Sequence, residues 1–100
     1  MAVPLSELPD GVHVTRLRET EPVDILRTGR TVVVRSLFCP HMGCIVRWEA
    51  AAAGFKCPCH GGAFDADGHP VSGPPPGPLR LMPIQLEADR VVILRRPRVT

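Results

Sequence analysis

Two short boxes of cysteine and histidine constrain this chain more than any other feature of its sequence. The first box spans Cys39–Cys44 and reads CPHMGC, and the second spans Cys57–Gly62 and reads CPCHGG. Together they contain all four cysteines and two of the four histidines. Thiolates and imidazoles gathered this closely are typical of metal binding. The rest of the sequence is therefore interpreted as a small scaffold that holds two metal-binding loops together.

Length and composition narrow the class of protein. One hundred residues predict one domain, 1–100, whose modest core benefits from a cross-link or a metal. A net charge of +2 with scattered arginines does not indicate nucleic-acid binding. The sequence contains no run of eighteen apolar residues, so no membrane span is predicted. The first residues also lack the pattern of a signal peptide. The chain is therefore expected to be either a cytoplasmic protein or a soluble fragment of a membrane-anchored protein.

The apolar pattern is mostly that of β-strands. Alternating or β-branched segments separated by turn residues predict an all-β sandwich or small barrel. Pro83 is expected to interrupt one of these segments. Asp65–Gly68 is interpreted as a hairpin turn, because it lacks the further ligands of a calcium loop. The expected strands lie within residues 12–17, 23–26, 31–34, 45–48, 54–56, 81–86 and 91–94.

Histidines and aromatic residues outside the boxes receive simpler interpretations. His13 lies in an alternating segment and His69 in a turn, so both are expected at the surface, and neither is assigned a role. Trp48, Phe38 and Phe55 are expected in the core or around the metal site.

Within the boxes, each loop offers one thiolate and one imidazole, from Cys39 and His41 in the first and from Cys57 and His60 in the second. Neighbouring glycines allow close approach of the backbone or positive φ angles. These glycines are Gly43, Gly61 and Gly62. One more cysteine remains in each box, Cys44 and Cys59.

The two boxes resemble those of the Rieske [2Fe-2S] proteins, in the disulfide-bearing branch found in cytochrome bc and bf complexes and in the small subunit of arsenite oxidase. That family's pattern, C-x-H-x-G-C followed by C-P-C-H-G, is matched at every fixed position. Gly73–Pro76 stands where the family has a proline loop that shields the cluster. The resemblance covers most of the chain.

By position, the resemblance implies that Cys39 and Cys57 hold one iron of a [2Fe-2S] cluster and that His41 and His60 hold the other. It also implies a disulfide between the remaining pair of cysteines. The implied fold is a Rieske-like antiparallel β-sandwich with a cluster-binding subdomain of two loops, at about residues 37–76. Residues expected around the cluster are Met42, Gly43, Gly61, Gly62, Phe64, Gly73, Pro74, Pro75 and Pro76.

Two positions depart from the quinol-oxidising members of the family. Many of those have Ser and Tyr where this chain has Gly62 and Phe64. Hydroxyls at these positions donate hydrogen bonds to cluster sulfur and stabilise the more negative, reduced state. Their absence predicts a lower reduction potential than in Ser/Tyr homologues.

The boxes are also compatible with two simpler interpretations. A closed Cys2His2 zinc site uses the same ligand types, but the C-x-H and C-x-x-H spacings differ from those of zinc fingers. A scaffold held by disulfides alone allows three pairings of four cysteines and leaves His41 and His60 without purpose.

The predicted function is one-electron transfer, without substrate chemistry of the chain's own. One form is a carrier or subunit of a quinol- or arsenite-oxidising complex, with a redox protein as partner. The second is a free Rieske ferredoxin that serves a separate oxygenase or reductase, and the third is a zinc-stabilised interaction module.

Overall fold

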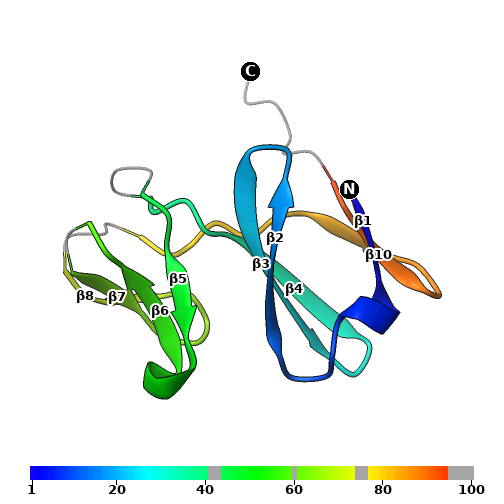
Figure 1. Cartoon of the computed structure of the whole chain (residues 1–100), viewed down its shortest axis with the longest axis horizontal. Coiled ribbons are helices and arrows are strands. Elements are labelled where there is room, and N and C mark those ends of the chain that lie inside the picture. The colour runs from blue at the N-terminus through cyan, green and yellow to red at the C-terminus, as the bar shows by residue number, and fades with distance from the viewer. Residues whose placement is uncertain (41–43, 60, 74–76, 95–100) are drawn as a thin grey trace.

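The computed structural model describes residues 1–40, 44–59, 61–73 and 77–94. Within these ranges the chain forms short antiparallel strands in three sheets and two single-turn 3-10 helices (Figure 1). No helix among the described residues is long and apolar enough to cross a membrane. The elements are β1 Ala2–Pro4, η1 Leu5–Glu7, β2 His13–Arg18, β3 Glu21–Thr28, β4 Thr31–Ser36, β5 Arg47–Glu49, η2 Ala50–Ala52, β6 Gly54–Cys57, β7 Gly62–Phe64, β8 Pro70–Ser72, β9 Ile84–Leu86 and β10 Arg90–Ile93.

Two of the sheets form a base. The first has the order β1-β10-β9 and the second the order β2-β3-β4. A hairpin joins β3 to β4 through Gly29, whose φ of +62° glycine adopts without steric cost. The buried apolar side chains of both sheets form one core, as expected when two half-buried sheets face each other. That core contains Val3, Leu8, Val23, Ile25, Val32, Val34, Met82, Val91 and Ile93.

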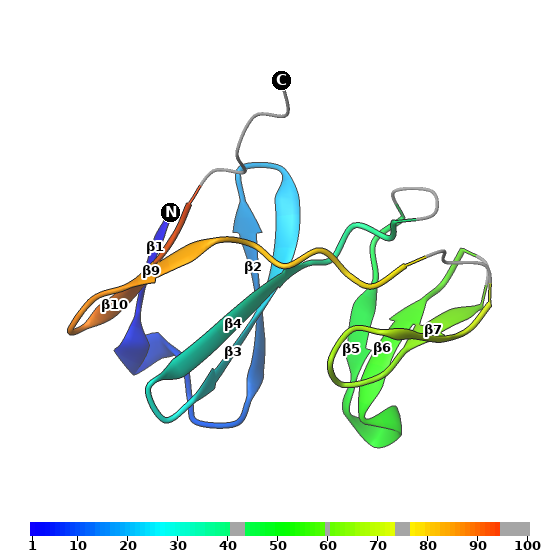
Figure 2. The same cartoon turned by 180° about the vertical axis from the view of Figure 1, so that it is seen from behind.

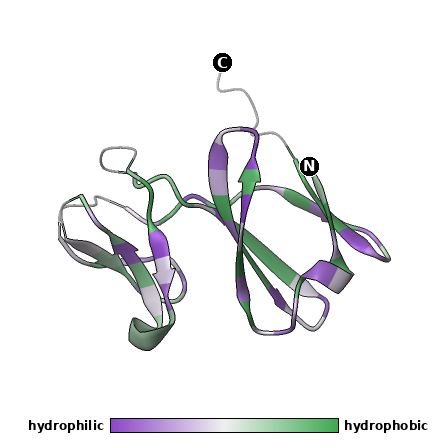
Figure 3. Ribbon diagram, viewed as in Figure 1, coloured by the Kyte–Doolittle hydropathy of each residue, from purple (hydrophilic) through white to green (hydrophobic). Residues whose placement is uncertain are grey.

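The third sheet, in the order β5-β6-β7-β8, forms a separate lobe beside the base (Figures 1 and 2). Apolar residues are distributed along the strands of both lobes (Figure 3). Gly54 in β6 leaves room for the neighbouring strand, because a Cβ atom there would collide with the carbonyl oxygen of Phe64. The core of this lobe contains Leu37, Cys39, Val46, Phe55, Cys57, Phe64 and Leu79.

The chain enters and leaves the second lobe at adjacent points of the base. It leaves β4 at Ser36 and returns beside the same strand, where the Ser36 N–H donates to the Arg80 carbonyl at 2.8 Å. The Met82 N–H then donates to the Val34 carbonyl, also at 2.8 Å. The second lobe is therefore an excursion between β4 and β9, and its two ends pair with each other.

The all-β sandwich predicted from the sequence is confirmed. Most of the predicted strands correspond to strands in the structure, including β2, β3, β4, β6 and β10. Pro83 separates β9 from Leu81, which makes only an isolated bridge to Arg35. β1, β7 and β8 were not predicted, because each has three residues and too short an alternation to recognise.

The predicted turn at Asp65–Gly68 is also confirmed, and it connects β7 to β8. The Asp65 side chain holds it, since its Oδ1 accepts from the backbone N–H of Asp67 at 2.9 Å and of His69 at 3.0 Å. Gly68 in the same turn has a φ of +79°. The His69 N–H, followed by that of Asp67, lowers the pKa of Asp65 below its ordinary value of 3.8.

This lowered pKa gives a pH-dependent contribution to stability. A carboxyl whose pKa is lower in the folded state stabilises the fold above its unfolded pKa, and the contribution is lost as pH falls through the folded pKa. We expect Asp65→Ala to lower the thermal midpoint at pH 7 and to have little effect at the most acidic pH that the protein tolerates. Melting curves between these limits measure the difference. Asp67→Ala is the control, because it keeps the backbone donor, and an equal, pH-independent loss in both variants would contradict the assignment.

Candidate metal centre

The first box lies at the tip of a narrow antiparallel ladder. The Val46 N–H donates to the Leu37 carbonyl at 2.7 Å, and the Cys39 N–H donates to the Cys44 carbonyl at 2.6 Å. Cys39 is buried, with 3% of its surface exposed, and belongs to the core of the second lobe. Backbone pairing therefore fixes the two ends of this box.

The second box lies at the tip of the β6–β7 hairpin. Cys57 pairs with Gly62, and Phe55 pairs with Phe64. Side chains two residues apart on a strand share a face, so these four residues lie on the same face of the sheet. All four are buried, whereas Lys56 on the opposite face is exposed. Gly62 and Phe64, where the family hydroxyls are absent, thus lie on the face that carries Cys57.

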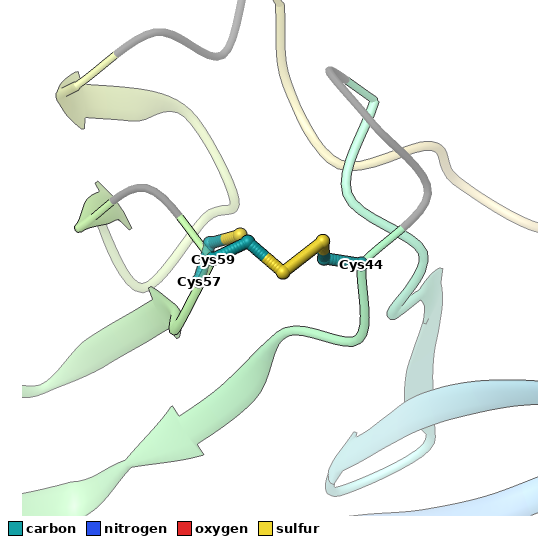
Figure 4. A group of neighbouring side chains, drawn as sticks. All are labelled: Cys44, Cys57 and Cys59. Carbon is teal, nitrogen blue, oxygen red and sulfur yellow. A yellow bond between two sulfur atoms is a disulfide. The ribbon is translucent and has the colours of Figure 1, made fainter.

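A disulfide joins the two tips, between Cys44 and Cys59, and confirms the pairing that the family resemblance implied (Figure 4). The Cα atoms of these cysteines are 6.4 Å apart. The Cys57 sulfur lies within 4.8 Å of both disulfide sulfurs. Cys39 and Cys57 take no part in the disulfide, and both are buried. The covalent link therefore leaves one buried thiol in each box.

These donors fit an iron–sulfur cluster. Thiolate sulfur is the protein ligand of iron in such clusters, and both thiols are shielded from bulk water. The backbone also approaches closely at the expected proline loop. Gly73 has a φ of +86°, and a Cβ atom there would lie 2.7 Å from the Gly62 Cα. The end of β8 thus packs directly on the second box.

Several predicted site residues lie outside the described part of the chain. They are the expected ligands His41 and His60, together with Met42, Gly43, Pro74, Pro75 and Pro76. Their assignments remain predictions from the sequence. Gly61, which is described, has a φ of +66°, in agreement with the expectation that the glycines of the boxes allow positive φ angles.

The interpretation of His13 as a surface residue was wrong. Its side chain is only 8% exposed and contacts Asp24, Trp48 and Phe55. The alternating pattern around it identified the strand but gave no sign that side chains of the second lobe cover the His13 ring. His69 is at the surface as expected, with a side chain 65% exposed.

Comparison with known proteins identifies the family. Residues 1–83 match the Rieske [2Fe-2S] domain. The chain therefore belongs to the Rieske [2Fe-2S] family, its cofactor is a Rieske [2Fe-2S] cluster, and its class of function is Rieske-type electron transfer.

One curated relative and one solved structure match most of this chain. The chain is 33% identical over 90 residues to the cytochrome b6-f complex iron-sulfur subunit of Chlorobaculum tepidum. This match covers 90% of the chain and 50% of the relative. This chain thus spans about half the length of that relative. A solved structure described as a hyperthermophilic respiratory Complex III has a TM-score of 0.74 and 27% identity, covering 91% of this chain and 72% of the other.

A second solved structure shares the fold. It is the ferredoxin of carbazole 1,9a-dioxygenase from Nocardioides aromaticivorans IC177, with a TM-score of 0.65 and 23% identity, and the match covers 95% of each chain.

The close packing at Gly73 gives a prediction. Gly73→Ala places a Cβ atom against the Gly62 backbone and forces alanine to a positive φ, which alone costs about 1–2 kcal/mol. We expect less acid-labile sulfide per chain and a lower midpoint of urea denaturation. Gly77→Ala is the matched control, because no atom lies within 4 Å of a Cβ there. Equal cluster content in the two variants would show that the contact at Gly73 does not support the site.

Proposed function

We propose that this chain is the electron-transfer domain of a quinol- or arsenite-oxidising complex, in which Cys39 and Cys57 bind one iron and His41 and His60 bind the other. The single observation that carries the proposal is the disulfide between the two boxes, which leaves one buried thiol on each hairpin. The identity to a cytochrome b6-f iron-sulfur subunit over 90% of the chain supports it. A cluster held by these residues would supply one-electron redox chemistry between a donor and an acceptor.

The residues of the chain contribute position and shielding. The two hairpins present their thiols from rigid ladders, and the disulfide holds the hairpins together. Burial of Cys39 and Cys57 excludes water, which influences the potential of an iron–sulfur site. The protein therefore positions the ligands and shields them from water, and it needs no catalytic side chain of its own.

An exposed apolar rim beside the first box supports contact with a redox partner. Phe38 and Ile45 pair across the ladder, next to Cys39 and Cys44, and are 36% and 53% exposed. Aromatic and aliphatic side chains with depleted charge are typical of the core of an interface. A rim of this small size fits a brief contact, as electron transfer requires.

Reduced-state EPR with a redox titration tests the ligand assignment. We expect a Rieske-type signal from anaerobically isolated wild-type protein and its loss in His41→Gln and His60→Gln. His69→Gln is the control, because this exposed histidine lies in the β7–β8 turn. An unchanged signal in either ligand variant would contradict the assignment, and stoichiometric zinc without acid-labile sulfide would contradict a cluster at this site.

Partner identity requires its own measurement. We expect the chain, isolated from its native cells in mild detergent, to bring with it a cytochrome b or a molybdenum-containing subunit. Isolation with a reductase or an oxygenase instead would favour the alternative, a Rieske ferredoxin that serves a separate enzyme.

The missing hydroxyls give a prediction about the potential. Because Gly62 and Phe64 share a face with Cys57, we expect Gly62→Ser and Phe64→Tyr each to raise the midpoint potential by donating to cluster sulfur. One net hydrogen bond of about 0.5–1.5 kcal/mol sets the scale of each shift. Ala63→Ser, between them on the opposite face, is the control. A midpoint potential unchanged in both variants would contradict the prediction that the missing hydroxyls lower it.

A further inference from the structure

A pocket of about 440 Å³ lies where the second lobe meets the base. One wall is the β7–β8 turn, which contributes Asp67 and His69, and the other is the returning segment 78–81. Arg35 on β4 of the base completes the lining. We call this the junction pocket. It is separate from the candidate metal centre, because the β7–β8 turn and the second box lie at opposite ends of β7.

Backbone pairing holds the walls of the junction pocket together. The Leu79 N–H donates to the Gly68 carbonyl at 2.8 Å, which joins the returning segment to the turn. Arg35 forms an isolated bridge with Leu81, which joins the same segment to β4. The pocket is thus built on a fixed frame, and a preformed site lowers the free energy that binding costs.

Arg35 is a buried cation without a hydrogen-bond partner in the described part of the chain. Only 8% of its surface is exposed, and its Nε and Nη1 atoms are buried and unpaired. A buried charge that lacks a partner costs free energy, which an aliphatic side chain of similar length would avoid. Packing therefore does not explain a guanidinium at this position. Because Arg35 lines the junction pocket, its unpaired donors point to an anionic ligand there.

Two carboxylates lie near Arg35, and both are engaged elsewhere. Asp24 lies opposite Arg35 in the β3–β4 register, and its Oδ2 atom is 2.8 Å from His13 Nδ1. Asp65 belongs to the turn whose Gly68 packs against Arg35, and its Oδ1 atom accepts from two backbone N–H groups. Among the described residues, neither carboxylate forms an ion pair with Arg35. The guanidinium can therefore turn a pair of donors toward a carboxylate that enters the pocket.

The charge of the junction pocket also favours an anion. Arg80 is exposed beside Arg35, and neither arginine forms an ion pair with a described residue. Asp67 is the carboxylate in the lining. Two arginines against one carboxylate leave a net charge of +1 when His69 is counted as neutral.

The remaining lining of the junction pocket is apolar. It consists of Pro78, Leu79 and Leu81, and the Leu81 side chain is 62% exposed. Sites for small molecules typically have volumes of about 300–1,000 Å³ and combine an apolar lining with a few charged or polar groups. The pocket is larger than a single inorganic anion requires. An anion that carries an apolar body therefore fits it better.

We propose that the junction pocket binds a small organic carboxylate whose charged group meets Arg35 and Arg80. The apolar body of this ligand contacts Pro78, Leu79 and Leu81. A ligand in this position touches the β7–β8 turn, the returning segment and β4 together, so it also strengthens the connection between the two lobes.

Isothermal titration calorimetry on the holoprotein tests the class of ligand. The probe is cyclohexanecarboxylate. Cyclohexanecarboxamide has the same ring without the charge, and inorganic phosphate has the charge without the ring. We expect the carboxylate to bind about tenfold more tightly than either, in line with the strength of a hydrogen bond to a charged group. Absence of carboxylate binding, or equal affinity for the carboxamide or for phosphate, would overturn the proposal.

A substitution of Arg35 tests the location of the site. Arg35→Met removes the guanidinium and keeps a long side chain, so we expect about a tenfold loss of affinity for cyclohexanecarboxylate. Arg47→Gln is the matched control, because the Arg47 side chain is 70% exposed and lies outside the pocket, and it should bind like the wild type. Equal affinity in folded Arg35→Met and in the wild type would overturn the role of Arg35.

Two exposed positions keep the test decisive if Arg35→Met does not fold. We expect Arg80→Gln to weaken binding about threefold and Asp67→Asn to strengthen it by a similar factor, because the first removes an attractive charge and the second a repulsive one. Unchanged affinity in both variants would overturn the proposal. Calorimetry detects this binding without electron transfer, so loss of the reduced-cluster EPR signal would count against the proposed function alone.

Discussion

The covalent link between two hairpin tips is the constraint on which the candidate site depends. Each hairpin is only a few residue pairs long, and isolated two-stranded ladders are marginally stable in water. Joining Cys44 to Cys59 fixes the two tips relative to each other in the folded state and restricts the unfolded chain. Cys39 and Cys57 can then remain buried thiols on facing loops, with their positions set by backbone pairing.

The protein has two separate cores, one that stabilises the base and one that contains the buried thiols of the candidate site. The base contains a core of Met82 and aliphatic side chains between two sheets, and none of the described residues of the candidate site belongs to it. The second core includes both buried thiols among aromatic and aliphatic side chains, so the ligands are themselves packing residues. A change in the packing of this lobe therefore changes the surroundings of the site directly, whereas the base meets the lobe through contacts such as the stacking of His13 on Trp48.

Much of the fold and site could be predicted from the sequence, for identifiable physical reasons. Strand segments such as Val23–Leu26 carry a β-branched apolar pattern, and the boxes combine rare ligand types at short spacing. β7 and β8 escaped prediction because three residues do not establish a period. His13 was misplaced because strand periodicity identifies a face of one strand and contains no information about which distant segment covers it. Its partners Asp24 and Trp48 come from two other strands, and only the tertiary structure brings them together.

Because the chain returns beside β4, the second lobe is an insertion whose two ends lie next to each other on the base. Ser36 and Arg80, which bound the excursion, are hydrogen-bonded neighbours, so a short connector could close the base in its absence. Loop-closure entropy grows slowly with length, and an insertion whose ends already touch adds little strain to its host. We therefore expect the core of the base to tolerate substitutions and changes of length between these two points.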